Sequence, residues 1–265
     1  MTIQAEIEFL VPAPGPLFTY ARETPSGAEA PTAQFVTLAV PIRDVRDGGA
    51  LGLEEHGAML GSWPTRVPRF DDEADVRKHY YAESAEIIRA VLSADSVVVF
   101  DHNVRRNTPW QQDSRHGVGL PVHHAHADYT PRSALRRLHE EFGAHAEAEV
   151  SRYLQVNLWR PIRGPVRDAP LAICDGSSLA TDALRTVELR YSERTGEIYY
   201  LVHAREQRWC FASDMQVEEA WLFKNFDSAP AKAASTAPHS AFADPRHPLA
   251  PPRESIEVRA LVVFR

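Results

Sequence analysis

PRESIEVRALVVF (252–264) is the most strand-like segment of this chain, and its two faces differ in polarity. Side chains alternate between the two faces of a strand. The polar face carries Arg253, Ser255, Glu257 and Arg259, and the apolar face carries Ile256, Val258, Ala260 and Val262. Such a strand can pack on a core with one face while the other lines the mouth of a jelly roll.

Similar β-rich runs recur along the chain, with turn residues between them. Many short strands without helices of matching length favour a sandwich or jelly roll over a βαβ sheet. The other runs are IEFLV (7–11), QFVTLAVPI (34–42), SVVVF (96–100), YLQVNLW (153–159), PLAIC (170–174), TVELRY (186–191), EIYYLVHA (197–204), RWCFAS (208–213) and AWLFKNF (220–226).

Two segments have helical character. Residues 71–94 carry apolar side chains at helical spacing, with acidic residues at the start, where the helix dipole favours them. Residues 131–152 follow Thr130 and open with Pro131, a typical pair of N-cap and first helical residue. The sequence therefore predicts a mainly β fold with flanking α-helices.

Residues 228–252 are dense in proline, alanine and serine, a composition that disfavours a central strand. Because His239 lies in this segment and a strong strand follows it, we expect a long active-site loop within one domain. We predict a single domain over residues 1–265, with residues 1–94 packing on a core formed by residues 95–265.

Bulk properties limit the classes of protein. The 29 basic and 36 acidic residues give a formal charge of −7, which disfavours a nucleic-acid partner. Cys174 and Cys210, the two cysteines, lie in apolar runs, so a disulfide framework is not expected. The sequence has no signal peptide or apolar segment of membrane-spanning length, which predicts a cytoplasmic protein without a membrane partner.

VHHAHADYT (122–130) contains a His-x-Asp triplet, His126 and Asp128, and His239 follows much later in the chain. If 120–130 is extended, His126 and Asp128 project from the same face. Two imidazoles and a carboxylate form the 2-His-1-carboxylate triad, which leaves positions open on ferrous iron. The alternative is a surface or capping pair, because one such triplet arises by chance in a chain of this composition.

Beyond His239, the polar face of residues 252–264 carries groups that suit a second anion. The planar guanidinium of Arg253 and the hydroxyl of Ser255, two residues on, could hold one carboxylate. Arg259 could serve instead, or it could pair with Glu257. His124 shares the strand face of His126, and either a place near the substrate or a structural role is open to it.

Five segments together resemble the fungal and bacterial hydroxylase/desaturase family. That family includes the aspergillic-acid hydroxylase, the fungal gibberellin desaturase and the oxidising component of cephamycin 7α-methoxylation. The resemblance covers about residues 95–265. Its segments are VHHAHADYT, VNLWRPIRGPVRDAPLAICDGSS, DMQVEEAWLFKNFDS, PHSAFADP and PRESIEVRALVVF.

The resemblance implies a double-stranded β-helix (jelly roll) and an enzyme that uses Fe(II), 2-oxoglutarate and O2. It implies His126, Asp128 and His239 as catalytic metal ligands, and Arg253 with Ser255 as the pair that binds the far carboxylate of 2-oxoglutarate. NLWRP also resembles a block that contacts this co-substrate in related oxygenases, which implicates Asn157 and Trp159. Trp159 replaces the usual tyrosine, so either hydrogen bonding or packing is open for it.

The leading hypothesis is an oxygenase that hydroxylates or desaturates a small anionic molecule, derived from an amino acid or a specialised metabolite, and releases succinate and CO2. One alternative is a ferrous oxidase without 2-oxoglutarate, and another is a non-catalytic jelly-roll binding subunit. Candidate substrate contacts are Arg106, in the run Arg105–Asn107, together with Arg160 and Lys224 in strands near the proposed site, and His124. For each charged residue the alternative is a solvated surface position. The oligomeric state is not predicted.

Overall fold

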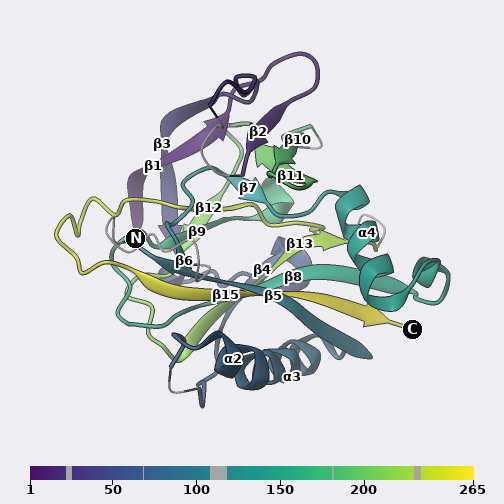
Figure 1. Ribbon diagram of the computed structural model, residues 1–265. Coiled ribbons are helices and arrows are strands. Elements are labelled where there is room, and N and C mark those ends of the chain that lie inside the picture. The colour runs from purple at the N-terminus through teal and green to yellow at the C-terminus, as the bar shows by residue number, and fades with distance from the viewer. Residues whose placement is uncertain (22–25, 68, 108–117, 181, 230–233) are drawn as a thin grey trace.

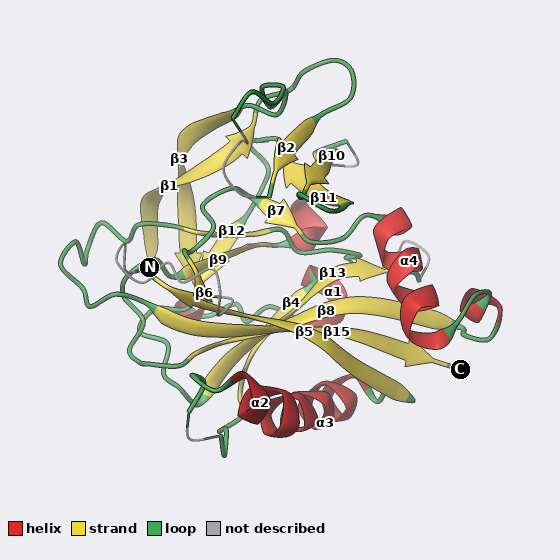
Figure 2. Cartoon of the chain, viewed as in Figure 1, coloured by secondary structure: helices red, strands yellow, loops and turns green. Residues whose placement is uncertain are grey.

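The computed structural model describes residues 1–21, 26–67, 69–107, 118–180, 182–229 and 234–265. Within these ranges the strands form one nine-stranded and one six-stranded sheet, which face each other (Figures 1 and 2). The predicted mainly β jelly-roll class with flanking helices is confirmed.

The nine-stranded sheet has the order β1-β3-β12-β9-β14-β7-β11-β10-β2 and is mixed. The β3–β12 and β10–β2 pairs are parallel, while β14 pairs antiparallel with both β9 and β7. Its strands are β1 Thr2–Leu10, β2 Phe18–Tyr20, β3 Phe35–Asp44, β7 His126–Ala127, β9 Leu171–Cys174, β10 Leu184–Arg190, β11 Thr195–Leu201, β12 Trp209–Phe211 and β14 His239–Ala241.

The six-stranded sheet has the order β4-β13-β8-β15-β5-β6. Its centre is the antiparallel set β13, β8, β15 and β5, which are long strands rich in valine, leucine and aromatic residues. Its strands are β4 Ala58–Ser62, β5 Ser96–Arg106, β6 Val118–Gly119, β8 Arg152–Pro161, β13 Glu219–Asp227 and β15 Glu254–Phe264. Each β-rich run of the sequence overlaps a strand, although the runs 197–204 and 208–213 extend beyond β11 and β12.

The first predicted helix is present as one helical stretch made of α2 Glu73–Asp75, a π turn Val76–Tyr80 and α3 Tyr81–Leu92. The second, α4 Pro131–Phe142, begins as predicted with Thr130 as N-cap but ends about ten residues early. Gly143, at φ 95°, ends it, since this region of backbone space favours glycine. Shorter helices are α1 Leu53–His56, η1 Val45–Asp47, η5 Ala146–Ala148 and η6 Gly176–Ser178.

Alternation along the six-stranded sheet separates a dry face from a polar face. Leu158, Val258 and Val262 pack with Tyr80 and Ile88 in a core beneath α3. The intervening residues of β15, which include Ser255 and Arg259, turn toward the nine-stranded sheet. The polar face predicted from residues 252–264 thus lies between the sheets, and α3 covers the outer face (Figure 2).

The prediction that the segment before Arg253 forms only a loop is wrong at residues 239–241. His239–Ala241 forms β14 in the middle of the nine-stranded sheet. The stretch His239–Asp244 contains no proline, and Pro238 takes part through its carbonyl, which accepts a hydrogen bond from the Cys174 amide at 2.7 Å. Composition averaged over the segment hid a strand this short.

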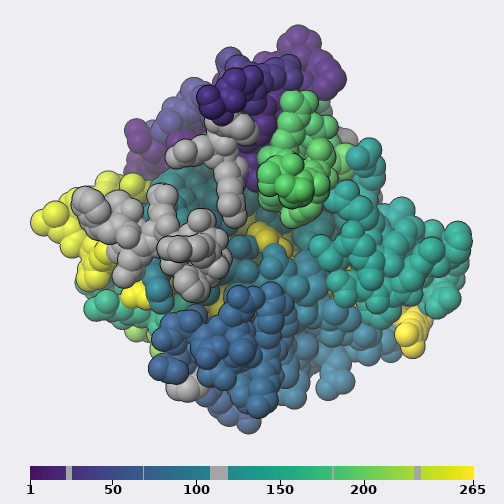
Figure 3. Space-filling view, in the orientation of Figure 1, coloured from purple at the N-terminus to yellow at the C-terminus, as the bar shows by residue number. Residues whose placement is uncertain are grey.

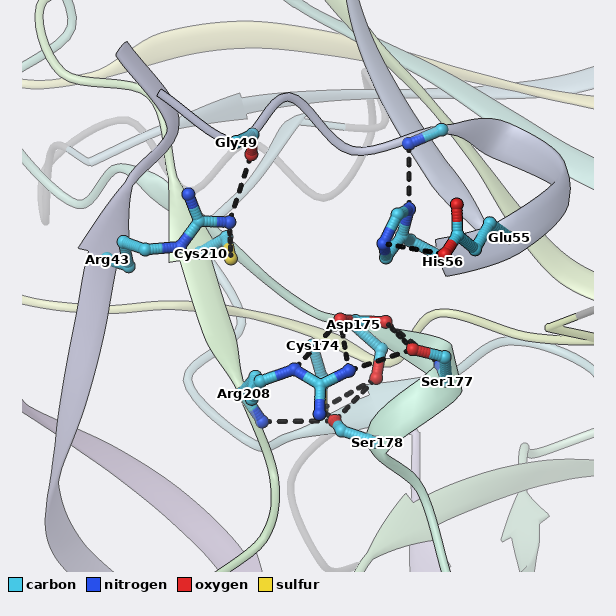
Figure 4. Close-up of polar contacts among 11 residues, drawn as sticks. Arg43, Gly49, Glu55, His56, Cys174, Asp175, Ser177, Ser178, Arg208 and Cys210 are labelled. Carbon is cyan, nitrogen blue, oxygen red and sulfur yellow. Dashed lines mark hydrogen bonds and ion pairs between the residues drawn. The ribbon is translucent and has the colours of Figure 1, made fainter. Parts of the chain in front are cut away.

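Polar contacts fix the loops at the ends of β9 and β12 (Figure 4). The Asp175 carboxylate accepts hydrogen bonds from Arg208 and from the amide of Ser177, which holds the turn of η6. Cys174 and Cys210 are free and buried, and burial raises the pKa of the Cys174 thiol to about 12. None of the helices within the described ranges is long and apolar enough to span a membrane.

Candidate metal centre

His126, Asp128 and His239 converge between the two sheets. Each offers one ligand atom, and these atoms all lie within 4.8 Å of one another. The convergence follows from strand pairing, since His239 of β14 lies directly opposite His126 of β7. Asp128 follows two residues after His126. Phe223 of β13 packs on the His239 ring, with the ring centroids 4.6 Å apart.

The orientation of His126 is set by the backbone. Its Nδ1 lies 2.7 Å from the carbonyl oxygen of His124. Because a carbonyl can only accept, Nδ1 carries the proton, and Nε2 presents its lone pair 3.7 Å from Asp128 Oδ1. Burial lowers the pKa of both His126 and His239 to about 4, so both imidazoles are neutral at neutral pH.

Asp128 is held by three side chains from the opposite sheet. Asn157 Nδ2 donates to its Oδ2 at 2.8 Å, and Arg259 Nε donates to the same oxygen at 2.9 Å. Asn225 Oδ1 accepts from the backbone amide of Asp128 at 2.9 Å. Burial alone would raise the pKa of Asp128, but Arg259 and the two imidazoles outweigh it and hold that pKa far below its usual range. The carboxylate is therefore ionised, with Oδ1 turned toward His126.

This donor set fits a divalent transition metal. Two neutral imidazoles and one ionised carboxylate are the ligands that ferrous iron takes in a facial triad. The second carboxylate oxygen of Asp128 accepts a hydrogen bond from Asn157, and the second ring nitrogen of His126 donates to a backbone carbonyl. Such outer hydrogen bonds are the usual way in which proteins fix the orientation of metal ligands.

A small pocket next to the cluster leads to Arg253 and is also lined by His126, His239, Trp159 and Glu257. Arg253 is buried, and its guanidinium carbon lies 5.5 Å from the centroid of the Trp159 ring. Burial, and then the nearby Arg105, lower the pKa of Arg253 to about 9, which leaves it charged at neutral pH. Arg253 Nε and Ser255 Oγ are buried, and neither has a hydrogen-bond partner among the described residues. These groups fit one end of a dicarboxylate.

A larger cavity of about 730 Å³ opens on the other side of the cluster and shares His126, Arg105 and Arg259 with the small pocket. It is walled by β5, α4, β10 and β11. In Figure 3 it lies near the centre of the face, between the green atoms of β10 and β11 and the blue and teal atoms of β5 and α4. A volume of this size suits a drug-sized molecule.

The predicted cofactor residues divide into two groups. Arg253 and Trp159 line the small pocket, and Ser255 lies on β15 between Arg253 and Glu257, which also lines it. Asn157 and Arg259 instead hold Asp128, and Arg259 also pairs with Asp101 at 3.0 Å. The Arg259 guanidinium is occupied by carboxylates and that of Arg253 is not, so Arg253 is the better placed of the two to bind a further anion.

Arg160 and Lys224, both predicted as substrate contacts, lie away from the two pockets. Arg160 turns to the α3 side of its sheet, where it donates to the hydroxyl of Tyr80 at 2.8 Å. Lys224 is fully buried and pairs with Asp227 at 2.7 Å. The prediction for these two residues is wrong because a residue one position out of phase along a strand points to the opposite face of the sheet. We leave both residues out of the proposed substrate site.

Arg106 and His124, the other two predicted substrate contacts, also have internal partners. Arg106 pairs with Glu254 at 3.0 Å. The His124 ring stacks on Phe35 with the centroids 3.9 Å apart, and its Nδ1 lies 2.7 Å from Glu8. Neither residue lines the two pockets. His124 contributes through its backbone carbonyl, which orients His126.

Sequence reasoning did not find Asn225 and did not separate Arg105 from Arg106. A buried asparagine in the apolar run AWLFKNF was a usable signal, because a polar group in a core strand needs a partner. The orientation of Arg105 depends on the register of β5 against β15, which pairs Arg105 with Ser255. No local pattern encodes that register.

Comparisons with known proteins agree with this geometry. A family model described as "YDMC: Oxidoreductase/YMDC permease-like domain" matches residues 7–263. The chain is 37% identical over 199 residues to the Fe(II)/2-oxoglutarate-dependent dioxygenase nvfI of Aspergillus novofumigatus, which spans 73% of this chain and 69% of that protein. It is 31% identical over 254 residues to the hydroxylase/desaturase efuI of Hormonema carpetanum, covering 87% and 85% of the two chains.

The fold also matches a solved structure. The iron and alpha-ketoglutarate-dependent endoperoxidase NvfI superposes with a TM-score of 0.88 at 28% identity, covering 99% of this chain and 98% of that one. Sequence, fold and the cluster of two histidines and one aspartate point the same way. The chain belongs to the Fe(II)/2-oxoglutarate-dependent dioxygenase family that contains these hydroxylases, desaturases and the endoperoxidase.

Proposed function

We propose that His126, Asp128 and His239 bind the ferrous ion of this oxygenase, and that Arg253 with Ser255 binds the far carboxylate of 2-oxoglutarate. The main support for this proposal is that a candidate metal site and a candidate carboxylate site lie side by side. A cluster with ligand atoms within 4.8 Å lies beside a buried arginine whose Nε has no partner among the described residues. A metal and a dicarboxylate that chelates it would complete both.

Each protein group has a defined task. His126 and His239 offer neutral nitrogens, and Asp128 offers one charge. Arg253 is a buried cation that already donates to the Ala169 carbonyl, but its Nε has no partner among the described residues, which makes carboxylate binding favourable. Trp159 closes the pocket on one side, so water is kept from the bound carboxylate.

Arg259 and Asn157 are positioning residues. Both donate to Oδ2 of Asp128, and this leaves Oδ1 facing the histidines. We expect these bonds to keep the carboxylate ionised and to leave Oδ1 as the oxygen that would hold a metal.

The iron and the co-substrate, when bound, supply the oxidising chemistry: O2 is consumed, 2-oxoglutarate becomes succinate and CO2, and a C–H bond of a small molecule is oxidised. The protein binds and orients the reactants. The cavity walls hold the substrate beside the cluster, and the choice between hydroxylation and desaturation depends on that placement.

Anaerobic titration of the Fe(II)-loaded protein with 2-oxoglutarate tests the assignment, with the metal-to-ligand charge-transfer absorption as the signal. Arg253→Ala should weaken 2-oxoglutarate binding by about ten- to a hundredfold, because it removes charge-assisted hydrogen bonds. Arg163→Ala, a surface arginine 67% exposed, is the matched control. Unchanged binding in the Arg253 variant would contradict the assignment, and succinate formation under O2 gives an independent check.

We also propose that the enzyme works in the cytoplasm on a small molecule, without nucleic acid or a membrane as partner. The net charge of −7 and the two free, buried thiols support this. Cell fractionation would test it, since recovery in a membrane or secreted fraction would contradict it.

A further inference from the structure

The large cavity is lined by more positive charge than the chain as a whole would suggest. The whole chain has a formal charge of −7, yet five arginines and four carboxylates line this cavity. The arginines are Arg105, Arg136, Arg137, Arg194 and Arg259, and the carboxylates are Asp101, Asp128, Glu140 and Glu197. A charged side chain that already pairs with another is less available to a ligand.

Most of the cavity charges are paired. Arg259 contacts Asp128 and Asp101, and Arg136 and Arg137 both contact Glu140. Glu197 pairs with Arg132 on α4 at 3.1 Å. Arg194 lies at the rim, with its guanidinium carbon 4.1 Å from the centroid of the Tyr191 ring.

Arg105 differs from Arg136, Arg137 and Arg259, which pair with carboxylates. One of its guanidinium nitrogens donates to the carbonyl oxygen of Leu120 at 2.7 Å, and no carboxylate lies within ion-pair distance of it among the described residues. Burial lowers the pKa of Arg105, and the nearby charge of Glu257 offsets part of that effect. Glu257 is paired with Arg259 instead, because its Oε1 lies 3.4 Å from the Arg259 guanidinium. A partly buried cation without a carboxylate partner favours binding of an anion.

The position of Arg105 suits contact with the substrate. It lines both the small pocket and the large cavity, so it lies where the two meet beside His126. The carboxylate at the far end of 2-oxoglutarate is already assigned to Arg253 and Ser255. Arg105 therefore remains for an anion that enters from the large cavity.

Aromatic residues also line the cavity. Tyr20, Tyr129, Tyr191, Tyr200 and Phe100 line it, and the Tyr200 ring centroid lies 6.4 Å from that of His126. Burial raises the pKa of Tyr129 and Tyr200 to about 12, so both remain neutral. Neutral phenol rings offer flat apolar surface together with a hydroxyl.

We propose that Arg105 binds a carboxylate of the substrate, and that the substrate is an amphipathic organic acid whose ring or hydrocarbon body packs on the aromatic residues that line the cavity. This inference rests on the proposed function, because it takes the small pocket to be filled by 2-oxoglutarate. A bidentate contact to Arg105 fixes one end of the substrate next to the cluster, and it thereby selects which carbon lies within reach of oxidation.

The test is calorimetric titration of protein loaded with Mn(II) and 2-oxoglutarate, in which no oxidation occurs. The probes are acid and amide pairs of increasing size: benzoate and benzamide, 2-naphthoate and 2-naphthamide, and biphenyl-4-carboxylate and its amide. We expect at least one acid to bind about tenfold or more tightly than its amide. Arg105→Gln should bring that ratio close to one, Arg105→Lys should restore part of it, and Arg163→Gln should leave it unchanged.

Three results would overturn the proposal: no acid binds more tightly than its amide, the preference survives in Arg105→Gln, or Arg105→Gln weakens 2-oxoglutarate instead. Unchanged 2-oxoglutarate affinity in the variant also shows that it is folded. Release of succinate in the absence of a substrate tests the proposed function separately, so failure of one claim can be told from failure of the other.

Discussion

At the scale of single residues, Asp128 is the most constrained group of the site. It lies beside two imidazoles and accepts two hydrogen bonds at one oxygen, while its amide donates to Asn225. Burial raises the Asp128 pKa, and Arg259 is the largest of the groups that together lower it below its usual range. Removal of Arg259 should therefore weaken the binding of the metal more than the binding of 2-oxoglutarate.

Arg259→Gln should weaken Mn(II) binding by about tenfold or more, because outer partners of metal ligands typically contribute about 10- to 100-fold to affinity. Arg259→Lys should restore part of the loss. Calorimetry with Mn(II), followed by 2-oxoglutarate at saturating metal, separates the two effects. If the variant bound metal normally but 2-oxoglutarate poorly, the roles given to Arg253 and Arg259 would have to be exchanged.

The two histidines should make the metal-free protein sensitive to acid. Burial lowers the pKa of His126 and His239 to about 4, whereas an unfolded imidazole has a pKa of about 6.5. Below pH 6.5 or so the unfolded state binds more protons, so the free energy of unfolding should fall as the pH falls from about 6.5 to about 4, and this contribution should then level off. Urea unfolding at a series of pH values measures it.

Other carboxylates also titrate in acid, so a comparison with the double variant His126→Gln/His239→Gln is needed. Its stability should depend less on pH between about 6.5 and 4 than that of the parent protein. An equal pH dependence in the two proteins would show that the imidazoles are not held neutral by the fold.

The candidate ligands could be named from the sequence because five segments together resemble a known family, whereas the His-x-Asp triplet alone arises by chance. The partners of those ligands could not. The sequence leaves Arg259 as a candidate to bind the co-substrate, but in the structure Arg259 contacts Asp128, which lies 131 positions away in the chain. Contacts of that sequence separation depend on how two sheets face each other, which the pattern of one strand does not contain.

At the scale of elements, β14 determines where His239 lies. It is three residues long and lies between β9 and β7, with the Ala241 amide donating to the Val122 carbonyl at 2.7 Å. The polar and apolar faces of β15 were readable from periodicity, because the strand is long. The three residues of β14, flanked by a segment rich in proline, show no period.

Ala241→Pro should remove the hydrogen bond to Val122 and displace His239. A lost ladder bond together with ring clashes should cost about 3 kcal/mol. We expect lower thermal stability and loss of tight Mn(II) binding. Leu249→Pro, at a residue 95% exposed in the following loop, is the matched control. Normal metal binding in the Ala241 variant would mean that β14 does not position the ligand.

At the scale of the whole molecule, the first 94 residues contribute to both sheets. β1 and β3 extend the nine-stranded sheet through the pairing of β3 with β12, and β4 pairs with β13 in the other. We therefore propose one cooperative domain, in which the N-terminal segment is part of the sheets and not a layer outside them.

The full chain should unfold in a single calorimetric transition whose midpoint rises when Mn(II) is added, because a ligand that binds only the folded state stabilises all of a cooperative unit. A chain that begins at residue 95 should not give this transition. Two separate transitions in the full chain, with only one shifted by metal, would contradict the proposal of one domain.

Anaerobic titration with Fe(II), read by calorimetry, should be carried out on the parent protein and on His126→Ala, Asp128→Ala and His239→Ala. We expect one tightly bound ion per chain in the parent and loss of that binding in each variant, with the far-UV circular dichroism unchanged. Tight binding of one ion that persists in any of the three variants would contradict the assignment of these three ligands.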